Sequence, residues 1–298
     1  MSAHFKAILQ ALLVTFLWST SVILIIVGLE TIPALTFAGL RYTVAFIILL
    51  PFAIRQSRKQ SIRQLTRADW LLLAGLGLAM YTLTQGSQFL ALQYLPAATH
   101  SLLLNFSSVV VLVMGVFWLS ESPTRAQIVG LLIFLVGVVL YFYPVAFSPD
   151  QWLGIGITAF QIVANALAAV LGRYINRSTK LSALLTTTVS MGIGALTLLF
   201  GGLAVQGLPI LDLNSLLIIG WLALVNTAFA FTLWNHTLRT LTAVESSLIN
   251  STMLIQIGIL AWIFLGDSLS LQEIIGMLIA AVGVMLVQLK GRRSQPAT

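Results

Sequence analysis

The fold is decided by the stretch LPAATHSLLLNFSSVVVLVMGVFWLSES, residues 95–122. Residues 241–268, LTAVESSLINSTMLIQIGILAWIFLGDS, repeat its pattern of small, polar and apolar side chains 146 residues later. Glu121 near the end of the first copy falls on Asp267 of the second. Each copy is 28 residues long and largely apolar. One membrane crossing needs roughly 20 apolar residues, so each copy is long enough to cross. The pair therefore predicts a duplicated membrane protein.

The composition of the whole chain supports this class. Of its 298 residues 59% are hydrophobic and only 8% are charged, and the mean hydropathy is +1.02. A soluble domain carries about 25% charged residues, so a water-soluble globule and a disordered chain are both excluded. The absence of cysteine excludes a disulfide scaffold. The net charge of +7 is explained by basic cytoplasmic loops, so no nucleic-acid partner is expected.

Hydrophobic runs between polar, proline and glycine residues predict ten membrane-spanning segments. Backbone groups in lipid must be satisfied within the segment, so each span is expected to be a helix. The spans are 7–27, 33–54, 71–92, 96–119, 125–143, 152–172, 181–204, 214–237, 243–265 and 271–289.

The distribution of charge predicts the direction of these spans. With a cytoplasmic N-terminus, fourteen of the fifteen Lys and Arg residues fall on the cytoplasmic side. The positive-inside rule therefore places both termini in the cytoplasm of a multi-pass protein of the cell (inner) membrane. The opposite loops carry no basic residue and four acidic ones, Glu30, Asp150, Asp212 and Asp267.

The offset of 146 residues divides the chain into two halves, residues 1–146 and 147–298, with five predicted helices each. Because five is odd, the first helix of one half runs outward while the first helix of the other runs inward. We therefore expect an all-α integral membrane protein built from two inverted five-helix repeats. Inverted repeats are typical of secondary transporters, whose binding sites lie near the membrane midplane.

The chain also resembles a known family. Its repeated pair, FWLSESPTRAQIVGLLIFLVGVVL (117–140) and IFLGDSLSLQEIIGMLIAAVGVML (263–286), is similar to the repeat signature of the drug/metabolite transporter superfamily, EamA type. FLWSTSVILI (16–25) and TFAGLRYTVAFIILLPF (36–52) are similar to the first two helices of that family. The resemblance covers nearly the whole chain and implies a ten-helix carrier of small metabolites, often an exporter of amino acids or other metabolites.

Polar side chains near the centres of the spans are the candidate binding residues, because polar groups inside a bilayer tend to face a cavity or one another. They concentrate on three spans of each half, which favours a shared central pocket. Any single one could instead make a hydrogen bond between helices. The substrate-binding residues predicted are Trp18, Ser19, Arg41, Tyr81, Gln85, Asn105, Gln161, Asn165, Asn226, Trp234, Asn250 and Gln256. Thr227 and Thr252 lie at the same depth.

Arg41 is the one basic residue away from the cytoplasmic face. An unpaired cation at the centre of a membrane helix costs about 2.5–3.5 kcal/mol on insertion scales. Three environments could offset this cost: snorkelling outward toward Glu30, bonding to carbonyls of a neighbouring helix, or facing the cavity, where a substrate carboxylate or phosphate could bind. A structural role and a role in binding an anionic or zwitterionic metabolite both remain open.

For several other candidate residues, a structural role is an alternative to a functional one. Gly130, Gly137, Gly276 and Gly283 recur at seven-residue spacing and predict close helix packing, in a scaffold or a homodimer face. His100 could be a pH-sensitive gate or a structural residue. Three tryptophans near span ends are expected to anchor at the membrane interface; they are Trp70, Trp118 and Trp152.

The sequence thus predicts an exporter of small metabolites such as amino acids, working by alternating access and acting as a monomer or homodimer in the lipid bilayer. No zinc spacing, phosphate-binding glycine loop or serine-elbow motif occurs, so neither an enzyme nor a cofactor or metal is expected. The alternative is a multidrug organic-cation/proton antiporter. Such carriers need a carboxylate in their first helix, and residues 7–27 contain none.

Overall fold

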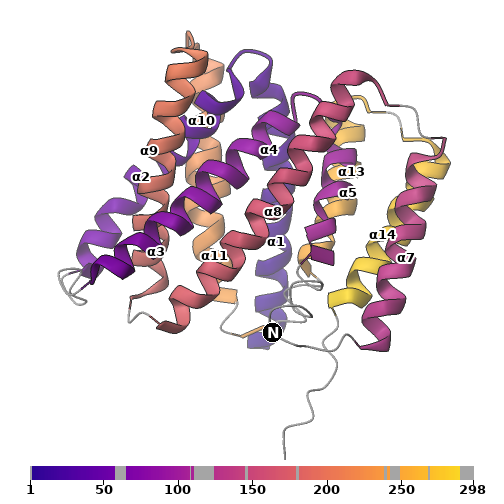
Figure 1. The fold of residues 1–298 in the computed structure, drawn as a ribbon, viewed down its shortest axis with the longest axis horizontal. Helices are drawn as coiled ribbons and strands as arrows, with labels where there is room; N and C mark the ends of the chain where they lie inside the picture. The colour runs from indigo at the N-terminus through magenta and orange to yellow at the C-terminus, as the bar shows by residue number, and fades with distance from the viewer. Residues whose placement is uncertain are drawn as a thin grey trace, which may run out of the picture. The chain divides into compact units, whose positions relative to one another are not determined.

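The computed structural model describes residues 2–57, 65–107, 109–110, 124–144, 147–178, 181–237, 240–241, 249–267 and 269–288. Throughout these ranges every regular element is a helix (Figure 1). The elements are α1 (Ala3–Leu29), α2 (Ala34–Ser57), α3 (Arg67–Gly77), η2 (Leu78–Gln85), α4 (Gly86–Ala91), α5 (Ala97–Leu104), α7 (Arg125–Phe142), α8 (Pro149–Ser178), α9 (Ala183–Gln206), α10 (Leu213–Ala223), η3 (Leu224–Phe229), α11 (Ala230–Thr237), α13 (Met253–Phe264) and α14 (Leu271–Gln288).

Local capping explains where several helices begin. Thr66 and Asp69 form a capping box at α3, in which the Thr66 hydroxyl accepts from the Asp69 amide and the Asp69 carboxylate accepts from the Thr66 amide. Thr124 and Gln127 form the same box at α7. These side chains satisfy amides that have no partner within the helix. The span predicted at 71–92 therefore begins earlier, at Arg67, whereas the span predicted at 125–143 begins where expected.

Six helices among the residues described are long and apolar enough to cross a membrane: Ala3–Leu29, Ala34–Ser57, Arg125–Phe142, Pro149–Ala168, Leu184–Gln206 and Leu213–Trp234. Large apolar side chains lie exposed on their outer faces; Phe52 is 61% and Val139 66% exposed. Exposed apolar surface on this scale is unfavourable in water and favourable in lipid. The chain is a membrane-spanning helical protein. Residues 111–123 and 242–248, which overlap two further predicted spans, lie outside the described residues.

The helix boundaries recur with the offset that the sequence repeats. The α3 and α10 helices, the η2 and η3 segments, and the α7 and α14 helices all start 146 residues apart. The α7 and α14 helices also have the same length, 18 residues each. Both η segments are π-helical turns set inside a longer helix, a rare feature. Its occurrence at equivalent positions indicates that the offset relates structure as well as sequence.

The chain forms two compact units, each combining helices from both sequence halves. Unit 1 contains Met1–Ile23, Pro96–Pro149 and Thr232–Thr298, and unit 2 contains Leu24–Leu95 and Asp150–Phe231.

Unit 2 is organised around α2 and α9, which pack against each other. Gly202 lies against Thr36 and Gly192 lies against the ring of Phe46, so residue numbers fall along α9 as they rise along α2. The two helices are therefore antiparallel. A Cβ atom at Gly202 would lie 2.7 Å from the backbone nitrogen of Thr36, so the close approach requires a glycine there.

Unit 1 contains the corresponding pair α7 and α14, which lie side by side (Figure 1). Gly130 lies against Val287 and Gly137 against Ala280, so this pair is antiparallel as well. A Cβ atom at Gly130 would lie 2.7 Å from the Val287 nitrogen, and one at Gly276 would lie 2.6 Å from the nitrogen of Tyr141 on α7. The predicted close helix packing is confirmed. The homodimer alternative is wrong for these glycines, because a helix of the same chain covers them.

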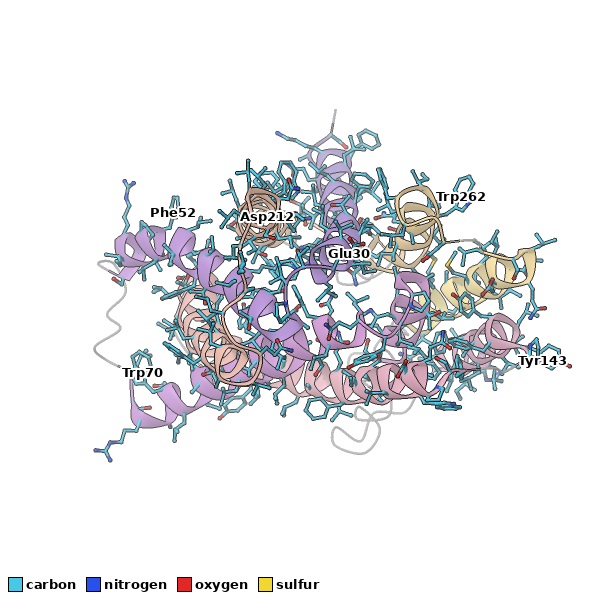
Figure 2. All side chains as sticks on the ribbon, turned by 90° about the horizontal axis from the view of Figure 1, so that it is seen from above. Glu30, Phe52, Trp70, Tyr143, Asp212 and Trp262 are labelled. Atoms are coloured by element: carbon cyan, nitrogen blue, oxygen red, sulfur yellow. The ribbon has the colours of Figure 1, made fainter. Side chains whose placement is uncertain are left out.

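Aromatic residues mark the periphery of both units. Figure 2 shows Trp262 and Tyr143 pointing away from the ribbons of unit 1, and both are more than half exposed. Trp70 at the start of α3 and Trp152 at the start of α8 are 42% and 57% exposed. Exposed tryptophans near helix ends suit the interface between lipid and water. Trp118, the third predicted anchor, lies outside the described residues.

Candidate functional site

The predicted binding residues divide equally between the two units. Unit 1 holds Trp18, Ser19, Asn105, Trp234, Asn250 and Gln256, and unit 2 holds Arg41, Tyr81, Gln85, Gln161, Asn165 and Asn226.

Gln256 on α13 is the centre of a polar cluster in unit 1. Its side-chain nitrogen donates to the hydroxyl of Thr252 at 2.9 Å and to that of Thr15 on α1 at 3.3 Å. Its carbonyl oxygen accepts from the hydroxyl of Ser19 at 2.9 Å. Thr15 and Ser19 are fully buried, one helical turn apart on α1. The structure therefore brings together Ser19 and Gln256, as the pocket prediction requires, through hydrogen bonds that cross from one helix to another.

Thr15 is the member of this cluster that sequence reasoning missed. It stands four residues before Ser19, on the same face of α1. That spacing was the available signal.

An aromatic pair accompanies the same segment of α1. The rings of Trp18 and Trp234 lie 5.2 Å apart between centroids, tilted by 53°. Trp234 also packs against a small apolar cluster that includes Ala7 and Ala11 of α1. Such tilted contacts are favourable for aromatic pairs. Trp18 and Trp234 are both half-buried, which suits a wall for an apolar part of a ligand as well as helix packing.

The other two amides of unit 1 do not join this cluster. The Asn105 side chain donates to the Ser101 carbonyl of its own helix at 2.8 Å. Asn250 is exposed. Depth along a span was therefore a poor guide to which way these two side chains point.

Arg41 of α2 is a buried cation in unit 2, with only 4% of its surface exposed. Its Nε donates to the hydroxyl of Thr227 in η3 at 3.2 Å. Its guanidinium carbon lies 5.1 Å from the ring centre of Tyr42 and 5.9 Å from that of Phe89, within the range of cation–π attraction. In the described part of the chain no carboxylate lies within 4.0 Å of it. Snorkelling toward Glu30 is therefore wrong: Arg41 is buried inside unit 2, whereas Glu30 is exposed.

Tyr81 lies where the η2 segment packs against α9, a contact that corresponds to the one between η3 and α2. It packs against Gly194 of α9, where an added Cβ atom would lie 2.8 Å from the Cβ of Tyr81, and its ring lies 5.6 Å from that of Tyr42. The next residue, Thr82, donates to the carbonyl of Gly194 at 2.9 Å. Tyr81 is buried. Arg41 and Tyr81 are thus connected through Tyr42, in one aromatic and cationic group.

Both π-helical segments supply a side chain to this group. Thr227 is the fourth residue of η3 and Tyr81 is the fourth residue of η2. A π turn widens the helix and occurs often at functional sites. The sequence carried no signal for either segment.

The remaining predicted residues of unit 2 lie at varied depths. Gln161 and Asn226 are buried and make interactions within the protein. Gln85 and Asn165 are half-buried. These positions are compatible with a polar lining.

The described carboxylates lie at helix ends or in loops. Hydrogen bonds from Thr66 hold the pKa of Asp69 below its ordinary value, and hydrogen bonds from Ser215 do the same for Asp212. Burial raises the pKa of Asp267, in the loop before α14. The α1 helix, which is described in full, contains no Asp or Glu. His100, the other candidate titrating group, is buried in α5.

Long apolar helices with exposed apolar faces, buried polar clusters and carboxylates kept at their ends define a multi-pass α-helical membrane protein. Residues 5–143 and 148–289 each match the EamA-like transporter family. The chain belongs to this family, and it is a transporter of the cell membrane.

Relatives with known names support this assignment. The chain is 26% identical over 295 residues to the uncharacterized transporter YvbV of Bacillus subtilis, covering 96% of this chain and 94% of YvbV. It is 25% identical to the uncharacterized transporter YoaV of the same bacterium over 294 residues, covering 94% of this chain and 96% of YoaV. A probable amino-acid metabolite efflux pump of Salmonella typhimurium is 29% identical over 131 residues, covering 44% of this chain and 40% of the pump. These names describe transport and not catalysis.

A protein solved by crystallography has the same fold. It superimposes with a TM-score of 0.68 over 98% of this chain and 100% of its own, at 18% identity. At this identity the likeness concerns the fold alone.

Proposed function

We propose that the protein is a secondary transporter that exports small metabolites such as amino acids by alternating access. In this proposal ten membrane helices form two inverted repeats, residues 1–146 and 147–298, with both termini in the cytoplasm. The observation that carries it is the antiparallel packing of equivalent helices, α2 against α9 and α7 against α14. Helices that are equivalent in sequence yet run in opposite directions are what an inverted repeat requires.

Inversion supports transport because of its symmetry. Two inverted halves can exchange conformations, so that a site near the midplane opens first to one side and then to the other. The two matched segments of the family, 5–143 and 148–289, agree with the proposed division of the chain.

In each unit taken by itself, polar and aromatic residues supply the proposed substrate contacts. The cluster around Gln256 with the Trp18–Trp234 pair, and the group around Arg41 with Tyr81, supply hydrogen-bond donors, acceptors and apolar walls. Ligand sites commonly combine such walls with a few placed polar groups. The remaining residues proposed to contact the substrate are Ser19, Gln85, Asn105, Gln161, Asn165 and Asn226.

Amino acids are proposed as substrates because one relative, over less than half of this chain, is named as a probable amino-acid metabolite efflux pump. The organic-cation/proton antiporter is disfavoured. Its mechanism needs a carboxylate in the first helix, which α1 lacks, and the buried charge of Arg41 would repel a cationic substrate.

Counterflow in proteoliposomes tests the proposal. Vesicles loaded with an unlabelled L-amino acid should accumulate its labelled form, because a carrier exchanges one molecule for another across alternating states. An inhibited or empty-vesicle control defines the background. Equal labelled flux with and without internal substrate would indicate a channel, and accumulation of tetraphenylphosphonium in place of amino acids would favour the cation antiporter.

A further inference from the structure

We infer that Arg41 is the anion anchor of the transport site and binds the carboxylate of the substrate. The inference rests on the proposed function and adds the substrate class to it: a small carboxylic acid, anionic or zwitterionic.

The guanidinium has donors to spare. Arginine carries five N–H groups in a planar fork, and one of them is used, by Nε toward Thr227. Throughout the described residues, the two terminal nitrogens of Arg41 meet no hydrogen-bond acceptor. They form the end of the fork that binds a carboxylate through two parallel hydrogen bonds.

The contact between α9 and the η2 segment is the counterpart of the contact between α2 and the η3 segment. Arg41 of α2 contacts the η3 segment through the hydroxyl of Thr227. Between the η2 segment and α9, the hydroxyl of Thr82 donates to the carbonyl of Gly194 at 2.9 Å. No charged group takes part in that hydrogen bond. The positive charge and the fork of Arg41 are therefore not required to hold a helix against a π segment.

In the part of the chain that the structure describes, the charge of Arg41 also lacks a counterion. No carboxylate lies within 4.0 Å of Arg41 among the residues described, and α1, α2 and α9 contain no Asp or Glu. A charge buried in a membrane protein is ordinarily paired. A substrate carboxylate supplies the missing negative charge and is recognised for the same reason.

The surroundings favour a carboxylate over a strongly hydrated cation. The rings of Tyr42 and Phe89 lie beside the guanidinium at 5.1 and 5.9 Å. They keep the cation in an apolar setting, where its attraction to an anion is stronger than in water. A positively charged substrate group would be repelled there, so the ammonium of a zwitterion must lie away from Arg41.

Thermal unfolding of the wild-type protein in detergent, with matched pairs of compounds, tests the inference without any mutation. The pairs are common L-amino acids and their carboxamides, which differ only in the charge of the carboxyl end. N-acetyl amino acids, which keep the carboxylate and lose the ammonium charge, separate anions from zwitterions. Ligands that bind the folded state raise the midpoint, so the acids should raise it and the carboxamides should not.

Variants assign the effect to Arg41. Arg41→Gln should weaken acid binding by about 10- to 100-fold, the usual value of a charge-assisted bond. Arg41→Lys should recover part of it, because it restores the charge without the fork. Arg55→Gln at the exposed end of α2 is the matched control and should bind as wild type.

The results separate the inference from the proposed function. Carboxamides that stabilise the wild type as well as the acids, or unchanged acid affinity in folded Arg41→Gln, would overturn the inference, and so would a lack of response to every acid. Counterflow of carboxamides alone would overturn it and leave transport standing. Acids that stabilise through Arg41 but never show counterflow would refute transport and leave the anion site standing.

Discussion

Replacing Gly137 by alanine should separate α7 from α14 and destabilise the protein. A Cβ atom at this position would lie 2.6 Å from the carbonyl oxygen of Gly276 and 2.8 Å from the Cα of Ala280. The first distance is 0.8 Å short of the 3.4 Å at which ordinary contact begins. The atoms it meets belong to the backbone, so no side chain can turn aside, and the helices themselves must move.

The size of the effect follows from two opposing terms. Overpacking costs about 1–3 kcal/mol, and alanine regains up to about 1 kcal/mol over glycine in a helix. The two terms together leave a net loss of up to about 3 kcal/mol, and its middle range of about 1–2 kcal/mol corresponds to roughly 2–8 °C in the unfolding midpoint of the detergent-solubilised protein. Gly201→Ala on α9 is the matched control: a Cβ atom there meets nothing within 4 Å, so its midpoint should rise by roughly 1–4 °C.

A Gly137→Ala protein with the midpoint of the control would refute the close antiparallel contact of α7 and α14. A second readout concerns assembly. Because Gly137 is covered by a helix of the same chain, the substitution should leave the molecular mass of the detergent-solubilised particle unchanged by light scattering. A dimer that dissociates while each chain remains as stable as before would show that this face works between chains.

Two further predictions concern topology and the polar cluster. In a chain without native cysteine, Ile210→Cys in the exposed loop before α10 should react with an impermeant thiol reagent in intact cells, and Ser57→Cys should not; the reverse pattern would overturn the orientation. Gln256→Leu removes the hydrogen bonds to α1 and should reduce counterflow far more than it reduces folded yield, whereas Asn250→Ala, at an exposed position, should be nearly silent. Equal loss of yield and activity for Gln256→Leu would assign the cluster to helix packing alone.

Helix positions were predictable because their determinants are local. The start of α7 follows from the pair Thr124 and Gln127, which satisfies the first amides of the helix. The contact of α7 with α14 was visible as glycines at fixed spacing, Gly130 and Gly137 among them, since only glycine lets backbones touch. Such signals do not depend on the rest of the fold.

The arrangement of the candidate site was less predictable, because it depends on how helices rotate and cross. The distance from a span centre gives the depth of Asn250 but not its direction, and the residue is exposed. Thr15 joins Gln256 only because α1 and α13 meet there. The π-helical segments that begin at Leu78 and Leu224 have no sequence signature. They shift the register of every side chain that follows.

The offset of 146 residues separates what the two halves share from what they do not. Gly130 pairs with Gly276 and Gly137 with Gly283, so identity is kept where backbones touch. The site residues diverge under the same offset: Trp18 falls on an alanine, and Gln256 is matched by a valine.

This division has a physical reason. Two inverted halves need equivalent scaffolds to exchange conformations, and backbone contacts tolerate no added atom. Recognition has the opposite requirement, because a small metabolite has chemically different ends and must meet different groups. Equivalent helix contacts in the two halves, combined with different side chains at the site, meet both requirements. Arg41, which falls on Thr187 under the same offset, is then the expected kind of difference: one half carries a charge that the other lacks, as the proposed carboxylate site requires.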